Sequence, residues 1–165
     1  MPAECVCIHL GQAGTHIGQD LWELLTLEHD IQPNGRMSTF YNANADKGDS
    51  WRAFFQEKAT GQYAPRAVLM DTDPSYKAEL QTRKIRDLFP PQNLLGYKQD
   101  CKGNFCEGRL QARERKILAH LEDRVRVTAE DCDSLQGLFV FHSLGTRVDS
   151  CIDDPGAFPP TRASA

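Results

Sequence analysis

The sequence predicts a doubly wound α/β fold, in which helices cover both faces of a parallel, Rossmann-like sheet and so make three layers. Two observations lead to this prediction. Apolar runs of strand length alternate with segments of helical periodicity, and the last run, GLFVFHS at 137–143, is continuously apolar, as is typical of a strand buried in a parallel sheet. The 165 residues, of which 40% are hydrophobic and 25% charged, suit one domain with a substantial core.

The first predicted unit is a strand, a glycine turn and a helix. Residues 5–10 form the strand, the glycines of GQAG follow it, and apolar residues then recur at helical spacing up to about His29. The polar stretch at 32–50 predicts a long surface loop before an aromatic cluster. That cluster consists of Trp51, Phe54 and Phe55. The run RAVLMD then predicts a buried strand that ends in Asp71.

The second half of the chain predicts two more helices and two more strands. One helix is expected to begin at Pro74, because proline is favoured in a first helical turn, and a short strand is expected at 93–97. The inward-facing residues of the two helices are expected to be Tyr76, Leu80, Leu88, Leu110, Ile117, Leu118, Leu121 and Val125. In a sheet of strand order 3-2-1-4, the last strand lies beside the first. Its other side is then an unpaired, apolar, proline-free edge, formed by Leu138, Phe139, Val140 and Phe141.

Composition argues against several classes of protein. The 19 basic and 23 acidic residues give a net charge of −4, which provides no field to draw the chain onto nucleic acid. No apolar run approaches the roughly 18 residues that span a bilayer, and the amino terminus does not resemble a signal peptide. The six cysteines lack paired C-x2-C spacing and are predicted to be free thiols rather than zinc ligands. We expect a cytosolic protein without nucleic-acid or membrane partners.

Ligands of doubly wound folds bind beyond the carboxyl ends of the strands, so the loops there are the candidate site. In GQAG, Gly11 and Gly14 let the backbone approach a phosphate at a helix start, although the common dinucleotide and P-loop fingerprints are absent. In DTDPS, Asp71 and Asp73 have the carboxylates that hold a magnesium ion, and they equally suit a turn and a helix cap. The sequence leaves both interpretations open.

Longer segments resemble the α-tubulin family. The resemblance begins with MPAECVCIHLGQAGTHIGQDLWELLTLEHDIQPNG and continues through FFQEKATGQYAPRAVLMDTDP, LFPPQNL and CDSLQGLFVFHSLG, so that it covers about residues 1–145. It implies a partial GTP-binding domain of the tubulin type, with GTP and Mg²⁺ as cofactors. It also implies a structural role in microtubules, β-tubulin or other tubulin subunits as partners, and a place in the cytoplasm and cytoskeleton.

The resemblance also implies the site residues. Asp73 falls where the family has a glutamate that contacts nucleotide and magnesium, and the loop QDCKGNFCEG matches the family in part. The nucleotide contacts that it implies are Gly11, Gln12, Ala13, Gly14, Asp73, Asp100, Asn104, Ser143 and Thr146, with Asp73 also as the metal ligand.

After Gly145 the sequence departs from the family. The family continues with a glycine-rich signature, Gly-Gly-Thr-Gly-Ser-Gly, whereas this chain has TRVDSCIDDPGAFPPTRASA. We therefore expect a truncated domain at 1–145 and an unrelated, disordered tail at 146–165. Because the main phosphate cradle is missing, nucleotide turnover stays an open question.

Two other classes of function are considered. The first is a non-polymerising fragment that binds tubulin or its folding chaperones, since the chain retains tubulin-like surface. The second is a hydrolase, because Ser143 follows a strand as in a nucleophile elbow. The first glycine of that elbow is Phe141 here and no histidine follows His142, so the general base is absent and the hydrolase is disfavoured.

Overall fold

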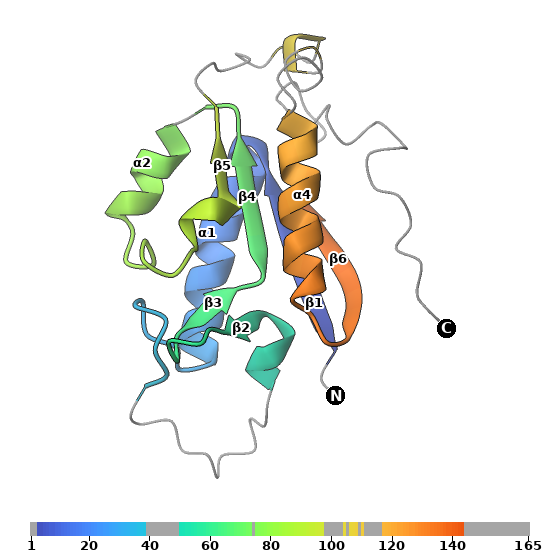
Figure 1. Cartoon of the computed structure of the whole chain (residues 1–165). Coiled ribbons are helices and arrows are strands. Elements are labelled where there is room, and N and C mark those ends of the chain that lie inside the picture. Colours follow the sequence, from blue (N-terminus) through green and yellow to red (C-terminus); the bar gives the residue numbers. More distant parts are fainter. Residues whose placement is uncertain are drawn as a thin grey trace.

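A parallel sheet runs through the centre of the structure (Figure 1). The structure is a computed structural model, and it describes residues 3–38, 50–73, 75–97, 104, 106–108, 110 and 117–143. In this part of the chain the sheet has four strands in the order β5-β4-β1-β6, and every neighbouring pair is parallel. The strands are β1 (Glu4–Leu10), β4 (Ala67–Asp71), β5 (Leu94–Gly96) and β6 (Leu135–Phe141). The predicted strand order 3-2-1-4 is therefore confirmed.

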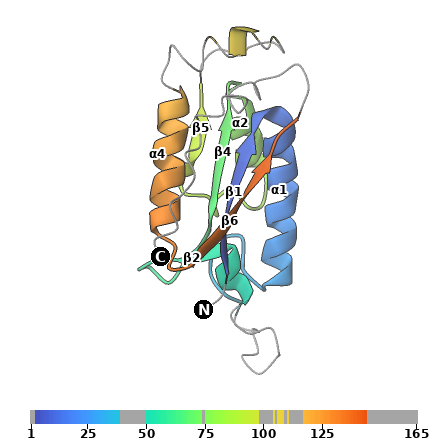
Figure 2. The ribbon, with the colours of Figure 1, turned by 90° about the vertical axis from the view of Figure 1, so that its right-hand side faces the viewer.

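Helices cover both faces of this sheet, which gives the predicted three layers (Figure 2). Two helices, α1 (Gly11–Glu28) and α2 (Ser75–Thr82), pack on one face, and α4 (Ile117–Glu130) packs on the other. Among the described helices, none is both long and apolar enough to cross a bilayer. The smaller elements are the 3₁₀ helices η1 (Ser50–Ala53) and η2 (Pro91–Asn93) and the antiparallel pair β2 (Phe55–Glu57) and β3 (Tyr63–Pro65).

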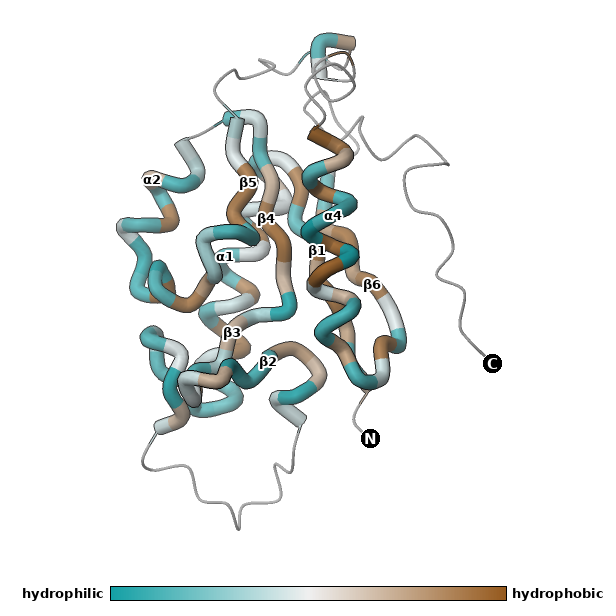
Figure 3. Tube along the Cα trace, viewed as in Figure 1, coloured by the Kyte–Doolittle hydropathy of each residue, from teal (hydrophilic) through white to brown (hydrophobic). Residues whose placement is uncertain are grey.

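The alternation of side chains along each strand divides the core in two. All five residues of β4 are buried, with Leu69 facing α1 and α2 while Val68 and Met70 face α4. Trp22 of α1 fills the first core and Leu121 of α4 fills the second. Figure 3 shows the resulting concentration of apolar residues along the strands between the helices.

Most predicted inward residues are buried as expected. These are Tyr76, Leu80, Leu88, Ile117, Leu121 and Val125, with Leu118 partly buried. Leu110 is exposed, so its assignment to the core was wrong. The expected glycine turn after the first strand is made by Gly11 alone, which has φ +66° and is also the first residue of α1. Within the polar loop predicted at 32–50, residues 39–49 lie outside the described residues, as does Pro74.

Strand β6 departs from the prediction made for its apolar run. Leu138, Phe139 and Val140 are 39%, 48% and 39% exposed, although a run of this kind is typical of a strand buried on both faces. The reason is its position, since within the described residues β6 pairs only with β1. The predicted apolar edge is confirmed for these three residues, whereas Phe141 is partly buried against the core.

A buried ion pair joins the amino-terminal ends of β1 and β4. The Arg66 guanidinium binds the Glu4 carboxylate, and both side chains are only 7% exposed. Arg66 also donates to the carbonyl oxygen of Asp131 at 3.1 Å, while the second Glu4 oxygen accepts the Ser134 N–H at 2.8 Å. One pair thus fixes the turn between α4 and β6 to the start of the central strands.

We predict that Arg66→Ala lowers the free energy of unfolding by about 3–5 kcal/mol, because it leaves the Glu4 carboxylate buried without its counter-charge. The double variant Glu4→Leu/Arg66→Met should lose less, since no charge then remains buried. Urea unfolding followed by far-UV circular dichroism measures both. As a control, Arg126→Ala removes exposed pairs with Asp123 and Glu130 and should change stability little. Equal effects of Arg66→Ala and Arg126→Ala would contradict the prediction.

Candidate nucleotide-binding site

The carboxyl ends of β4, β1 and β6 meet at one edge of the sheet. The strands are parallel neighbours, and the register sets Leu10 beside Met70 and His9 beside Phe141. The segments that follow the three strands therefore lie next to one another, as the fold class requires for a ligand site.

Helix α1 begins at this edge without a side-chain cap. Gly11 has φ +66°, a left-handed conformation that glycine adopts without strain, and it turns the chain from β1 straight into the helix. Leu10 occupies the N-cap position and makes no side-chain cap hydrogen bond, and the first turn has no acidic residue. Gln12 and Ala13 are exposed there. A first turn of this kind presents backbone N–H groups and the positive end of the helix dipole to an anion.

Gly14 is required by packing. A Cβ atom built at Gly14 would lie 2.2 Å from the carbonyl oxygen of Phe141, so only a glycine lets α1 approach the end of β6 this closely. The Thr15 hydroxyl donates to the Gly11 carbonyl oxygen at 3.0 Å inside the same turn. Sequence reasoning assigned Gly14 to phosphate approach alone and missed its contact with β6, because that contact depends on the strand order.

The segment after β4 is held by its own aspartates. Asp71 is buried and its Oδ1 accepts the Asp73 N–H at 3.1 Å, while Asp73 Oδ1 accepts the Ser75 N–H at 2.8 Å. Asp73 is thus the cap of α2, which was one of its two predicted roles, and its role as a metal ligand stays a prediction. Thr72, between them, is buried and its Oγ1 has no hydrogen-bond partner among the described residues.

The unpartnered Thr72 hydroxyl supports a polar ligand at this edge. Leaving a buried hydroxyl without a partner costs about 1–3 kcal/mol, which a phosphate oxygen or a metal-bound water would offset. Asp71 and Asp73 offer the oxygen ligands that magnesium prefers, and the first turn of α1 offers N–H donors. The donor set fits a magnesium-bound phosphate group. Thr72 was missed because a threonine in a turn carries no sequence signal of burial.

The remaining predicted residues lie on other segments. Ser143 follows β6 and is half-buried. Asn104 is exposed, and its Oδ1 accepts the N–H groups of Cys106 at 3.0 Å and Glu107 at 3.4 Å, so these hydrogen bonds stay within its own segment. Asp100 and Thr146 lie outside the described residues.

His9 holds the first turn of α1 in place from inside the core. Its Nε2 accepts the indole N–H of Trp22 at 3.1 Å, so the ring proton is on Nδ1, which donates to the Gly14 carbonyl oxygen at 3.2 Å. The ring stacks on Phe141 with centroids 4.7 Å apart, and a Cβ at Gly18 would lie 2.6 Å from His9 Nδ1. Burial lowers the pKa of His9 from 6.5 to about 4, opposed in part by the hydrogen bond to Gly14. The imidazole is therefore neutral at physiological pH.

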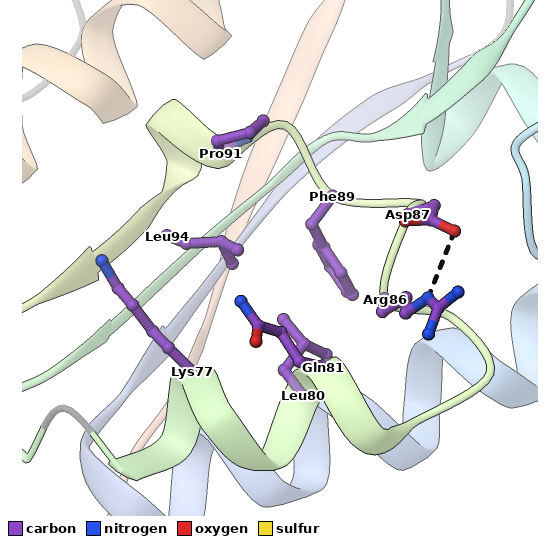
Figure 4. A pocket seen from close by; sticks show the side chains of 8 residues that line it. All are labelled: Lys77, Leu80, Gln81, Arg86, Asp87, Phe89, Pro91 and Leu94. Atoms are coloured by element: carbon purple, nitrogen blue, oxygen red, sulfur yellow. Dashed lines mark hydrogen bonds and ion pairs between the residues drawn. The ribbon is translucent and has the colours of Figure 1, made fainter.

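A separate pocket of about 520 Å³ lies between α2 and the segment leading to β5 (Figure 4). Its lining combines charged and apolar side chains, and Arg86 pairs there with Asp87 at 3.4 Å. It contains none of the predicted site residues, so the edge of the sheet remains the better candidate site. Among the described residues no group of three or more His, Cys, Asp and Glu side chains could hold a metal ion.

Fold and site together define a three-layer α/β domain whose loops at the carboxyl edge of a parallel sheet suit a phosphate ligand. Comparison of sequences identifies the family within this class. Residues 4–150 match the model of the Tubulin/FtsZ family, GTPase domain, and the chain belongs to this family. The match extends beyond the predicted domain boundary at Gly145.

Curated relatives are α-tubulin chains. The chain is 38% identical over 142 residues to the tubulin alpha-2 chain of Caenorhabditis elegans, which covers 86% of this chain and 31% of the relative. It is 39% identical over 145 residues to the tubulin alpha-2 chain of Emericella nidulans (88% and 32%) and 39% identical over 142 residues to the tubulin alpha chain of Pneumocystis carinii (86% and 31%). The chain thus spans about a third of the length of these relatives.

We predict that protonation of His9 makes stability depend on pH. Below about pH 6.5 the unfolded chain binds a proton at His9, whereas the folded protein does not do so until about pH 4. The free energy of unfolding should therefore fall as pH decreases through this window, by about 3 kcal/mol in total. Urea unfolding at a series of pH values measures the slope.

Carboxylates titrate in the same pH range, so the contribution of His9 is measured by comparing the pH dependence of the free energy of unfolding between variants. His9→Gln should lose this component of the slope, and His16→Gln, at an exposed histidine, should keep it. An unchanged slope in His9→Gln would show that another group dominates.

We predict that Gly14→Ala destabilises the fold by about 1–3 kcal/mol or more, because the new methyl group overlaps the Phe141 carbonyl and α1 must move outward. Thermal unfolding followed by circular dichroism measures the loss. Gly137→Ala is the matched control, since a Cβ at Gly137 meets no atom within 4 Å. Similar losses in the two variants would contradict the assignment of Gly14 to close packing.

Proposed function

We propose that this chain binds a guanine nucleotide with Mg²⁺ at the carboxyl edge of its sheet, as a tubulin-type GTP-binding domain. The observation that supports this most directly is the juxtaposition of the uncapped first turn of α1 with the Asp71–Asp73 segment. Membership of the GTPase domain family supports the choice of nucleotide. When bound, Mg²⁺ neutralises part of the phosphate charge.

Each segment of the site has a separate task in this proposal. The N–H groups at Gln12 and Ala13 orient the phosphates, and the exposed Gln12 side chain contacts the nucleotide. The carboxylate of Asp73 would hold the metal, with a shorter reach than the glutamate that the resemblance places there. Asn104, Asp100, Ser143 and Thr146 complete the proposed contacts by resemblance.

The proposed role of the chain is that of a tubulin-like structural subunit in the cytoplasm and cytoskeleton, with β-tubulin or other tubulin subunits as partners. The support is the identity to α-tubulin chains over most of this chain. A second candidate is a non-polymerising fragment that binds tubulin or its folding chaperones, and the exposed apolar strand β6 favours it. Weak nucleotide binding without turnover would favour the second candidate over an active subunit.

We predict measurable, magnesium-dependent binding of GTP that is much weaker than that of a whole tubulin. The glycine-rich signature is absent from the sequence, and each charge-assisted N–H hydrogen bond that such a signature donates to a phosphate is worth about 1.5–3 kcal/mol. Equilibrium titration with a fluorescent GTP analogue, with Mg²⁺ and with a chelator, measures the affinity. Tubulin-like affinity would contradict the proposed weakness.

Variants at Asp73 test the site itself. Asp73→Ala should weaken binding in Mg²⁺ about tenfold and leave binding in chelator unchanged, whereas Asp73→Glu should strengthen it by restoring the longer reach. Asp123→Ala, on the exposed side of α4, is the control and should bind as the wild type does. If the affinity depends neither on Mg²⁺ nor on Asp73, the nucleotide binds at another site.

A further inference from the structure

The pocket between α2 and the segment leading to β5 has the size and lining of a ligand site. Its volume of about 520 Å³ is within the usual range for sites of small molecules. All of its lining residues belong to one stretch of the chain, 77–94, at the opposite end of the sheet from β6. The pocket shares no residue with the proposed nucleotide site.

The floor of the pocket is apolar and is held in place by the core. Leu80 of α2 and Phe89 are buried members of the core between the sheet and α1, and Leu94 of β5 packs against that core. The Phe89 ring also makes an edge contact with Trp22, with the ring centroids 6.3 Å apart. The surface that these side chains offer to an apolar group is therefore preformed.

Charged side chains stand at the two ends of the pocket, with Gln81 between them (Figure 4). Arg86 at one end pairs with Asp87 at 3.4 Å, so these two charges compensate each other. Lys77 lies at the other end, and within the described part of the chain its ammonium has no ion-pair partner. One uncompensated positive charge beside an apolar floor complements a ligand that combines one negative charge with an apolar body.

Gly96 determines where the Lys77 side chain lies. A Cβ atom at Gly96 would be 2.7 Å from Lys77 Cε and 3.3 Å from its Nζ, so the lysine stem lies over β5 in space that a glycine leaves free. Lys77 is half-buried there. A packed stem has fewer accessible rotamers, so the lysine loses less entropy when it pairs with a ligand.

We propose that this pocket binds a small carboxylate with an apolar body, of the arylalkanoate class. The apolar body packs on Leu80, Phe89 and Leu94, and the carboxylate pairs with the Lys77 ammonium, which Gly96 positions. A monovalent carboxylate fits better than a phosphate, because a phosphate dianion is typically bound by several cations or N–H groups and this pocket offers one uncompensated cation.

Titration of the isotope-labelled full chain with 3-phenylpropionate, followed by backbone amide chemical shifts, tests the proposal. We expect saturable shifts concentrated at residues 77–94, with a dissociation constant of about 1 mM for a ligand of this size. The alcohol 3-phenylpropan-1-ol has the same apolar body without the charge, and it should bind at least about threefold more weakly. Shifts concentrated at β6, or carboxylate binding that does not saturate, would overturn the proposal.

Three single variants separate the charge of Lys77 from the shape of the pocket. Lys77→Gln should abolish the preference for the carboxylate over the alcohol and leave binding of the alcohol unchanged. Gly96→Ala keeps the cation but displaces its stem, and should weaken binding of the carboxylate at least about twofold. Lys84→Gln removes an exposed lysine that does not line the pocket, and should keep the full preference.

Urea unfolding verifies that each variant folds, and binding of the alcohol verifies that the apolar floor is intact. A preference for the carboxylate that survives Lys77→Gln, or that Lys84→Gln lowers equally, would overturn the pairing with Lys77. Wild-type binding of the carboxylate by Gly96→Ala would overturn the positioning role of Gly96.

Discussion

The hydrogen bonds of His9 determine how α1 sits on the sheet. One ring nitrogen accepts from Trp22, near the middle of the helix, and the other donates to Gly14 in its first turn. Because β1 is the strand between β4 and β6, a helix fixed to β1 is also fixed relative to both neighbours. The position of the first turn of α1 against the ends of β1 and β6 therefore depends on this buried, neutral imidazole.

Features with a local origin were predictable from the sequence. The alternation around Leu69 and the helical spacing of Leu121 and Val125 are periodicities that burial imposes within one element, and the structure confirms them. The strand order followed because doubly wound sheets admit few arrangements. The predicted glycine turn between strand and helix is present, and Gly11, in a left-handed conformation, makes it within a single residue.

Features that depend on distant neighbours could not be predicted from the sequence. The run at Leu138–Val140 is typical of a buried strand, and only the neighbours of β6 reveal that it is an edge. Glu4 and Arg66 are 62 residues apart, and nothing local indicates that their charges are buried together. In the candidate site, the sequence identified Asp73 but left open whether it is a helix cap or a metal ligand. Only the hydrogen bond from the Ser75 N–H to its carboxylate shows that it caps α2.

Gly14 and Gly18 are one helical turn apart. At each of them, a group of the sheet occupies the space that a side chain would fill. The carbonyl of Phe141 occupies one position and the imidazole of His9 the other. Two such contacts prevent α1 from both rotating about its axis and sliding along it. A displacement of the first turn of α1 would therefore also have to displace the ends of β1 and β6.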